Sequence, residues 1–133
     1  MKLLETSFLV DYLNEQPYTI EYLEANAQAE YAISTITLYE VYAGAIRSTA
    51  SGETIETITD AIAWADVVAF DESAAREAAD IRAALLDRGS SIPAPDILNT
   101  GVARSLGCEL IATDEHFAEI PQLNTHNPRD SHS

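Results

Sequence analysis

The sequence contains little cysteine and no segment long and apolar enough to cross a membrane. Its 133 residues include a single cysteine, Cys108, so no disulfide can form within the chain. No apolar run approaches the roughly 20 residues that a membrane-spanning helix needs. The first residues, Lys2–Leu4, lack the long apolar stretch of a signal peptide. These absences predict a cytoplasmic protein that does not associate with membranes.

Basic residues are also scarce. Seven bases, of which only Lys2 is a lysine, face 22 acids, and the formal net charge is −15. The acids are spread along the chain, and an acidic surface repels both itself and nucleic acid. High salt weakens this repulsion, since the Debye length falls to about 3 Å at 1 M. The composition therefore predicts a halophilic protein, with an ordinary acidic protein as the alternative, and by itself it argues against RNA as a partner.

Apolar side chains, in contrast, are abundant and occur in short periodic segments. A chain of 133 residues that is 47% hydrophobic is suited to one domain with one core. Short apolar segments predict strands at 2–4, 31–33, 67–70, 110–112 and 123–126. Helical spacing predicts helices at 8–13 (capped by Thr6 or Ser7), 17–27, 35–47, 51–64, 73–88 and 96–106. We expect a single domain over residues 1–133, with a tail that frays from about residue 127.

Strands alternate with helices along the whole chain. This order predicts a three-layer α/β/α sandwich with a mostly parallel sheet of four to five strands. In such sheets, ligands bind in the crevice outside the carboxyl ends of the strands. Candidate functional residues should therefore directly follow the strands or begin the helices beside them.

Three acidic residues occupy such places, and a fourth lies inside one of the predicted helices. Glu5 follows the first strand, Asp114 follows the strand at 110–112, Asp96 begins a helix, and Glu40 lies in the helix after the second strand. Each has a simpler explanation by itself, because Asp96 and Asp114 suit helix N-caps while Glu5 and Glu40 suit a solvated surface. Carboxylates that converge, however, raise one another's pKa unless a cation neutralises them, and burying them without one is costly. Together the four acids predict a metal site.

The types of ligand indicate which metal this site would hold. All four candidates are oxygen donors, and no cysteine or histidine stands at the spacing of a zinc site, which favours Mg²⁺ or Mn²⁺. Ions held by carboxylates commonly act on phosphate esters, where they activate a water and stabilise the leaving oxygen. The residues thus favour a hydrolase that acts on phosphate esters.

Four segments of the chain resemble the acidic motifs of the PIN-domain nucleases. They follow one another in the family's order across almost the whole chain, at 3–11 (LLETSFLVD), 33–44 (ISTITLYEVYAG), 92–98 (IPAPDIL) and 110–117 (LIATDEHF). Each motif alone is weak, whereas the four in order are specific. The size of the chain and the helix at 73–88 look most like the VapC-type toxins of toxin–antitoxin pairs.

The resemblance implies a PIN-like fold and a metal-dependent endoribonuclease that hydrolyses RNA phosphodiesters with a metal-activated water. It also implies Mg²⁺ or Mn²⁺ as the cofactor, a homodimer, and inhibition by a VapB-type antitoxin. Carried onto this sequence, the catalytic and metal-binding acids are Glu5, Glu40, Asp96 and Asp114. Thr6 or Ser7 would hold the first carboxylate or a water bound to the metal.

The chain departs from the family pattern at two positions. Glu5 stands where the family usually has Asp, and its extra methylene carries the carboxylate further into a site where Mg²⁺ tolerates little distortion. Our hypothesis is that Glu5 weakens or shifts the metal, and the alternative function is a catalytically impaired PIN-domain binding protein. Asn99, one helical turn after Asp96, would either join the site through a water or remain a polar residue at the edge of the core.

Three other interpretations are open. His116, close to the fourth acid, suggests acid–base catalysis, including a ribonuclease that needs no metal, or simply a histidine on a helix surface. Arg82 and Arg88 would contact RNA phosphates or pair with acids of the helix at 73–88. Phosphatases of the haloacid dehalogenase type also have an acid after their first strand, but they need a nucleophilic Asp and a second acid two residues later, which the sequence at Glu5 does not supply.

Overall fold

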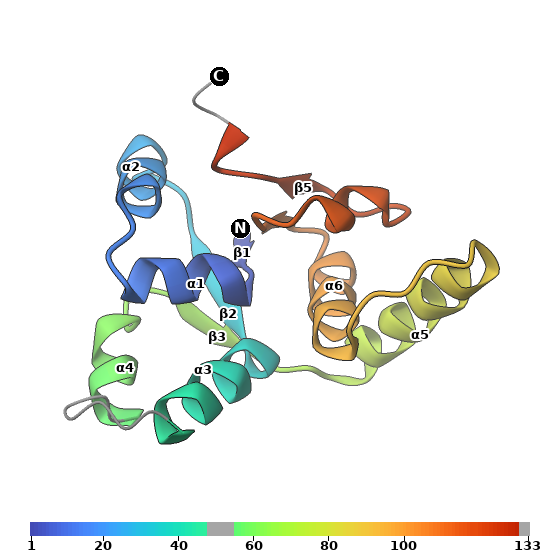
Figure 1. The fold of residues 1–133 in the computed structure, drawn as a ribbon, viewed down its shortest axis with the longest axis horizontal. Coiled ribbons are helices and arrows are strands. Elements are labelled where there is room, and N and C mark those ends of the chain that lie inside the picture. The colour runs from blue at the N-terminus through green and yellow to red at the C-terminus, as the bar shows by residue number, and fades with distance from the viewer. Residues whose placement is uncertain (48–54, 131–133) are drawn as a thin grey trace.

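The computed structural model describes residues 1–47 and 55–130 and has a five-stranded parallel sheet with helices against both faces (Figure 1). The strands are β1 (Lys2–Leu4), β2 (Tyr31–Ser34), β3 (Asp66–Val68), β4 (Glu109–Ile111) and β5 (Thr125–His126). Their order across the sheet is β3-β2-β1-β4-β5, and every neighbouring pair is parallel. The predicted three-layer sandwich with a mostly parallel sheet is confirmed.

Helices cover both faces of this sheet. One face carries α1 (Thr6–Leu13), α2 (Pro17–Ala25), α3 (Thr35–Arg47) and α4 (Ile55–Ala61), and the other carries α5 (Glu72–Asp87) and α6 (Ala94–Leu106). A short 3-10 helix, η1 (Glu115–Glu119), lies between β4 and β5. Among the described residues, no helix combines the length and the apolar character needed to cross a membrane.

The central strand β1 has apolar side chains toward both faces of the sheet. Leu3 and Leu4 are fully buried, and consecutive strand residues point to opposite faces. Leu3 packs with Leu110 in the core beneath α5 and α6, while Leu4 packs with Ile111 in the core beneath α1 to α4. The register pairs Leu3 with Leu110 and Leu4 with Ile111. The residues that directly follow β1 and β4 are therefore neighbours at one edge of the sheet.

Two helices begin at positions that differ from the prediction. The cap of α1 is Glu5, whose side chain accepts a hydrogen bond from the Ser7 amide, rather than the hydroxyl residues after it. α6 begins at Ala94 rather than near Asp96, because Pro95 in its first turn already has a helical φ and has no amide hydrogen to satisfy. Both shifts place an acidic side chain at a helix start, next to the edge of the sheet where β1 and β4 end.

The outer strands are shorter than predicted. β3 ends at Val68 instead of residue 70, where the Phe70 amide donates a hydrogen bond to Thr35 Oγ1 instead of joining the sheet. β5 has two residues rather than four, β4 runs one residue earlier than predicted, and α2 ends two residues sooner. The helix predicted at 51–64 corresponds to α4, and the first part of that prediction lies outside the described residues.

The segment after β5, which we expected to fray, is held against the rest of the molecule. Asn127 Nδ2 donates to the Thr113 carbonyl at 3.1 Å. Arg129 Nη2 lies 3.0 Å from Asp11 Oδ2, and its guanidinium stands 4.7 Å above the Tyr18 ring. This segment therefore ties the loop after β4 and the helix α1 to the edge strand, while the last three residues lie outside the described part of the chain.

Candidate active site

A pocket of about 530 Å³ lies where β1 and β4 end. Three of the four predicted acids line it: Glu5, which follows β1, Asp114, which follows β4, and Asp96 in the first turn of α6. The remaining lining residues are Ser7, Thr113, Glu115 and Phe117. The fold thus brings together three carboxylates that are far apart in the sequence.

Glu5 is almost completely buried, with 3% of its surface exposed. Its Oε2 accepts hydrogen bonds from the Ser7 amide at 2.8 Å and from Ser7 Oγ at 2.6 Å, and Ser7 Oγ lies 3.1 Å from Thr113 Oγ1. Burial raises the pKa of Glu5, the Ser7 bonds oppose that rise, and the nearby charges of Asp96 and Glu40 add to it. Of the two hydroxyl residues predicted to hold the first carboxylate, Ser7 is the one in contact with it.

Glu40 borders the pocket without being one of its lining residues. Thr6 Oγ1 donates to Glu40 Oε1 at 2.6 Å and lies 3.0 Å from Thr37 Oγ1. The charge of Glu40 contributes to the raised pKa of both Glu5 and Asp96, so it acts on the same pocket. Thr6 therefore fixes the second acid, not the first.

Behind these acids lies a buried network of hydrogen bonds. Asn99 is fully buried, accepts a hydrogen bond from Ser34 Oγ, and donates through Nδ2 to Thr37 Oγ1 at 3.1 Å. The Thr37 amide also donates to Ser34 Oγ, at 3.1 Å. Because Thr37 contacts Thr6, the network continues to the residue that holds the second acid. Asn99 is not a lining residue of the pocket and instead supports it from within the core.

His116, for which the sequence left open a catalytic role or a place on a helix surface, contacts two of the acids. Its Nε2 lies 3.2 Å from Asp96 Oδ2, and its Nδ1 lies 3.0 Å from Asp114 Oδ1. Burial raises the pKa of Asp96, the charge of His116 opposes this rise, and the charges of Glu40 and Asp114 add to it. The one signal in the sequence was the spacing of His116, two residues after the acid that caps η1.

No arginine or lysine is among the residues that line this pocket. Arg82 and Arg88 were expected either to contact RNA phosphates or to pair with the acids of α5. It is Arg104 that contacts Glu77 at 2.8 Å and also pairs with Asp80. Arg88 instead donates to a backbone carbonyl of η1. Among the described residues, therefore, no lysine or arginine from the walls of the pocket neutralises its carboxylates, and the basic side chain in contact with two of them is His116.

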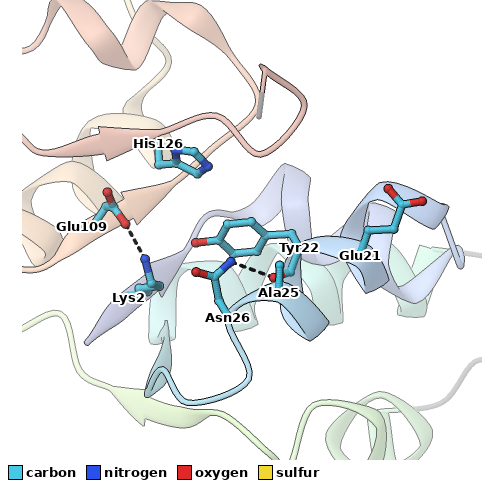
Figure 2. Close-up of a pocket in the computed structure, with 7 residues that line it drawn as sticks. All are labelled: Lys2, Glu21, Tyr22, Ala25, Asn26, Glu109 and His126. Atoms are coloured by element: carbon cyan, nitrogen blue, oxygen red, sulfur yellow. Dashed lines mark hydrogen bonds and ion pairs between the residues drawn. The ribbon is translucent and has the colours of Figure 1, made fainter. Parts of the chain in front are cut away.

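The single lysine of the chain lines a different pocket, of about 480 Å³, shown in Figure 2. Lys2 Nζ lies 2.7 Å from Glu109 Oε1, and the ring of Tyr22 stacks on His126 nearby. Lys2 and Glu109 begin β1 and β4, whereas Glu5 and Asp114 of the candidate site follow these strands. The lysine charge is thus matched by an acid at the opposite end of the strands and does not offset the candidate site.

The donor set of the candidate site suits a hard, hydrated cation. Among the described residues, no three or more histidine, cysteine or acidic side chains are gathered closely enough to form a ready-made metal centre. Glu5, Asp96 and Asp114 nevertheless share one pocket, where burial and the charges of neighbouring acids raise the pKa of Glu5 and Asp96, and they offer only carboxylate oxygen as ligand. Mg²⁺ usually keeps several waters and binds through a few carboxylates rather than a closed protein cage. The residues present fit that kind of ion.

Comparison with known proteins covers nearly the whole chain. The PIN domain family matches residues 2–123. The tRNA(fMet)-specific endonuclease VapC of Shigella flexneri is 26% identical over 124 residues, which are 92% of this chain and 94% of that protein. The fold is similar to VapBC2 of Rickettsia felis bound to a DNA fragment from its promoter (TM-score 0.86, 25% identity, 95% of this chain and 97% of that one). It is equally similar to DNA-bound VapBC of Salmonella typhimurium (TM-score 0.85, 26% identity, 96% and 97%).

Proposed function

The chain belongs to the PIN domain family, and we propose that it is a VapC-type toxin, a metal-dependent endoribonuclease that hydrolyses RNA phosphodiester bonds. The observation that carries this proposal is the meeting of Glu5, Asp96 and Asp114 in one pocket at the carboxyl ends of the strands. The similarity to a VapC endonuclease over 92% of the chain supports the same activity. We propose that residues 1–133 act as a single PIN-like domain.

The proposed ligands of Mg²⁺ or Mn²⁺ are Glu5, Glu40, Asp96 and Asp114. When bound, the ion would activate a water for attack on phosphorus and stabilise the leaving oxygen. The other side chains orient these acids: Ser7 holds Glu5 through two hydrogen bonds, and Thr6 holds Glu40 through one. Asn99 acts one step further back, since it holds Thr37, which contacts Thr6.

The charge of the pocket explains why RNA binding would depend on the cation. The lining residues include four acids and no lysine or arginine, so a phosphate group entering the pocket alone would be repelled. The amino end of α1, which starts at Thr6, adds a partial positive charge beside the pocket. RNA binding and hydrolysis of the phosphodiester bond would therefore both require a divalent ion.

We also propose that the toxin acts in the cytoplasm, as a homodimer, and that a VapB-type antitoxin neutralises it. The similar solved structures from Rickettsia felis and Salmonella typhimurium are VapBC complexes. Large apolar side chains are exposed on several helices, and Tyr39, Ile46 and Leu86 each expose 60% or more of their surface. Such residues are candidates for the covered surface of an assembly. Light scattering of the purified chain with and without the antitoxin would measure both associations.

The test is cleavage of RNA, including an initiator tRNA, by the purified chain in Mg²⁺, Mn²⁺ or EDTA. We expect cleavage only with a divalent ion, and Asp96→Asn and Glu40→Gln should each reduce the rate by about a hundredfold or more, because removing even an outer partner of a metal ligand costs ten- to hundredfold. Glu109→Gln, which removes a carboxylate at the opposite end of β4, is the matched control and should retain activity. Cleavage that survives EDTA would instead favour a metal-free mechanism.

One observation favours the alternative of an impaired enzyme that binds its antitoxin or RNA without cutting. Glu5 is one methylene longer than the usual Asp, and its Oε2 is already held twice by Ser7. If this geometry prevents metal binding, calorimetric titration of the chain with Mn²⁺ will show no heat of binding. A measurable affinity for Mn²⁺, together with RNA cleavage, would eliminate the alternative.

A further inference from the structure

We propose that His116 is a positioning residue that braces the carboxylates of Asp96 and Asp114 for divalent-ion binding, an inference that rests on the proposed function. The imidazole lies between the two acids, with Nε2 at 3.2 Å from Asp96 Oδ2 and Nδ1 at 3.0 Å from Asp114 Oδ1. One ring therefore connects an acid in the first turn of α6 with an acid that caps η1.

The position of this ring is itself fixed by the fold. The His116 amide donates to Asp114 Oδ1 at 3.2 Å, so the acid caps the helix that carries the ring. The next residue, Phe117, is 2% exposed and anchors η1 in the core, and its ring lies 4.4 Å from the imidazole. Because the backbone of η1 is anchored on one side and capped on the other, the imidazole has little freedom to leave the two acids.

The contacts leave part of each carboxylate available. His116 approaches Oδ2 of Asp96 and Oδ1 of Asp114, so the second oxygen of each acid is not taken up by the imidazole. The contact with Asp114 is the closer one. Nε2 meets no acceptor with the alignment of a directed hydrogen bond, so its approach to Asp96 is mainly electrostatic. Carboxylates that bind metals are typically held in this way by a second polar group.

The same arrangement recurs at the other two acids of the site. Ser7 contacts Glu5, and Thr6 contacts Glu40, each through a hydroxyl from α1. With His116 on the remaining pair, every proposed ligand has a polar partner that restricts its side chain. A role in acid–base catalysis fits less well, because both ring nitrogens already face carboxylates and would have to leave them to exchange a proton with RNA.

Binding of Mn²⁺ to the RNA-free protein tests this role without relying on activity. Calorimetry and the electron paramagnetic resonance of free Mn²⁺ would compare the wild type with His116→Phe, which keeps an aromatic ring but has no nitrogen, and His116→Gln, which keeps one polar group. We expect the Kd of His116→Phe to rise about ten- to hundredfold and that of His116→Gln to rise less. His126→Phe, in the pocket of Figure 2, is the matched control and should bind Mn²⁺ as the wild type does.

The outcomes separate this inference from the proposed function. If the wild type binds Mn²⁺ and His116→Phe binds it equally well or more tightly, the positioning role of His116 is wrong, but the proposed metal site is still supported. If the wild type itself does not bind Mn²⁺, both the proposed metal site and the positioning role of His116 are wrong. Thermal unfolding would show whether each variant is folded, and if His116→Phe is not, His116→Gln decides: an unchanged Kd would overturn the inference.

Discussion

At the level of single residues, Glu5 both caps a helix and contributes a carboxylate to the candidate site. Its Oε2 accepts two hydrogen bonds from Ser7, one of them from the amide at the start of α1. A shorter Asp would be the more usual N-cap residue. Burial and the two bonds to Ser7 hold a side chain that is one methylene longer than the family's usual Asp.

The substitution Glu5→Asp should therefore increase activity. We expect faster RNA cleavage and tighter Mn²⁺ binding, because the shorter carboxylate suits the octahedron of the ion better. Stability should change by no more than about 1 kcal/mol, since Asp also caps helices well. Glu5→Gln keeps the length but removes the charge, and it should lose Mn²⁺ binding. Equal cleavage rates for the wild type and Glu5→Asp, measured in both Mg²⁺ and Mn²⁺, would remove the idea that Glu5 impairs the site.

The position of a residue was predictable where its own strand or helix determines it. It was not predictable where a contact with a distant segment of the chain determines it. Glu5 and Asp114 follow buried strands, and parallel strands end at the same edge, so their proximity follows from local sequence. The contact of His116 with Asp96 was not predicted, because it depends on how η1 packs beside α6, which no local pattern encodes. For Asn99 the sequence left open a place in the site or a place at the edge of the core, and it bonds to Ser34 within the core.

At the level of elements, the close packing of α5 against α6 determines where Asp96 stands. The two helices meet at Gly101, where a Cβ atom would lie 2.6 Å from the Ala74 carbonyl oxygen and 2.7 Å from Ala78 Cβ. Only a residue without a side chain allows this approach. The position of the first turn of α6, and of Asp96 within it, thus depends on a backbone contact at Gly101, about one and a half turns further along the helix.

Gly101→Ala should consequently destabilise the protein. We expect a loss of about 1–3 kcal/mol in the free energy of unfolding, the usual cost of forcing an extra methyl into a packed contact. Gly44→Ala is the matched control, because Gly44 also lies in a helix but a Cβ there has no neighbour within 4 Å. That control should be neutral or more stable by up to about 1 kcal/mol. Denaturant unfolding would compare the two, and equal effects would contradict the packing argument.

The pattern of elements was largely readable from the sequence, while the order of the strands was not. Apolar segments and helix caps located every strand and every α-helix of the described residues to within a few residues, whereas the short helix η1 was not among the predicted elements. Strand order depends on pairing between distant segments: β1 lies between β2 and β4, whose first residues are Tyr31 and Glu109. The outer strands β3 and β5 were overpredicted because an apolar segment does not show where its hydrogen-bond partners end.

At the level of the whole molecule, the net charge of −15 sets the conditions under which the protein would bind RNA. Most ion pairs found among the described residues are formed by arginines. These arginines, Arg76, Arg104 and Arg129, are therefore already paired with acidic side chains of the protein itself. Little positive charge therefore remains to attract a phosphate backbone. Screening of the acids by salt would compensate for this, since the repulsion between exposed charges acts over the Debye length.

RNA cleavage should therefore persist or increase as KCl is raised from about 0.1 to 1 M, which is opposite to the usual trend for proteins that bind nucleic acid through released counterions. The thermal unfolding midpoint should rise over the same range because the repulsion among surface carboxylates is screened. Measurement of both, with RNA alone at each salt concentration as the control, checks the prediction. A steep fall in cleavage with KCl would contradict adaptation to salt.

The central place of β1 has a consequence for synthesis on the ribosome. β1 is the middle strand of the sheet, and one of its two neighbours, β4, is synthesised only after α1 to α6. Until then, Leu3 and Leu4 lack half of their partners, and Glu5 has no Asp114 beside it. Pairing across so long a stretch of chain is slow to form. A nascent chain of this protein would therefore lack a complete candidate site until β4 and Asp114 have left the exit tunnel.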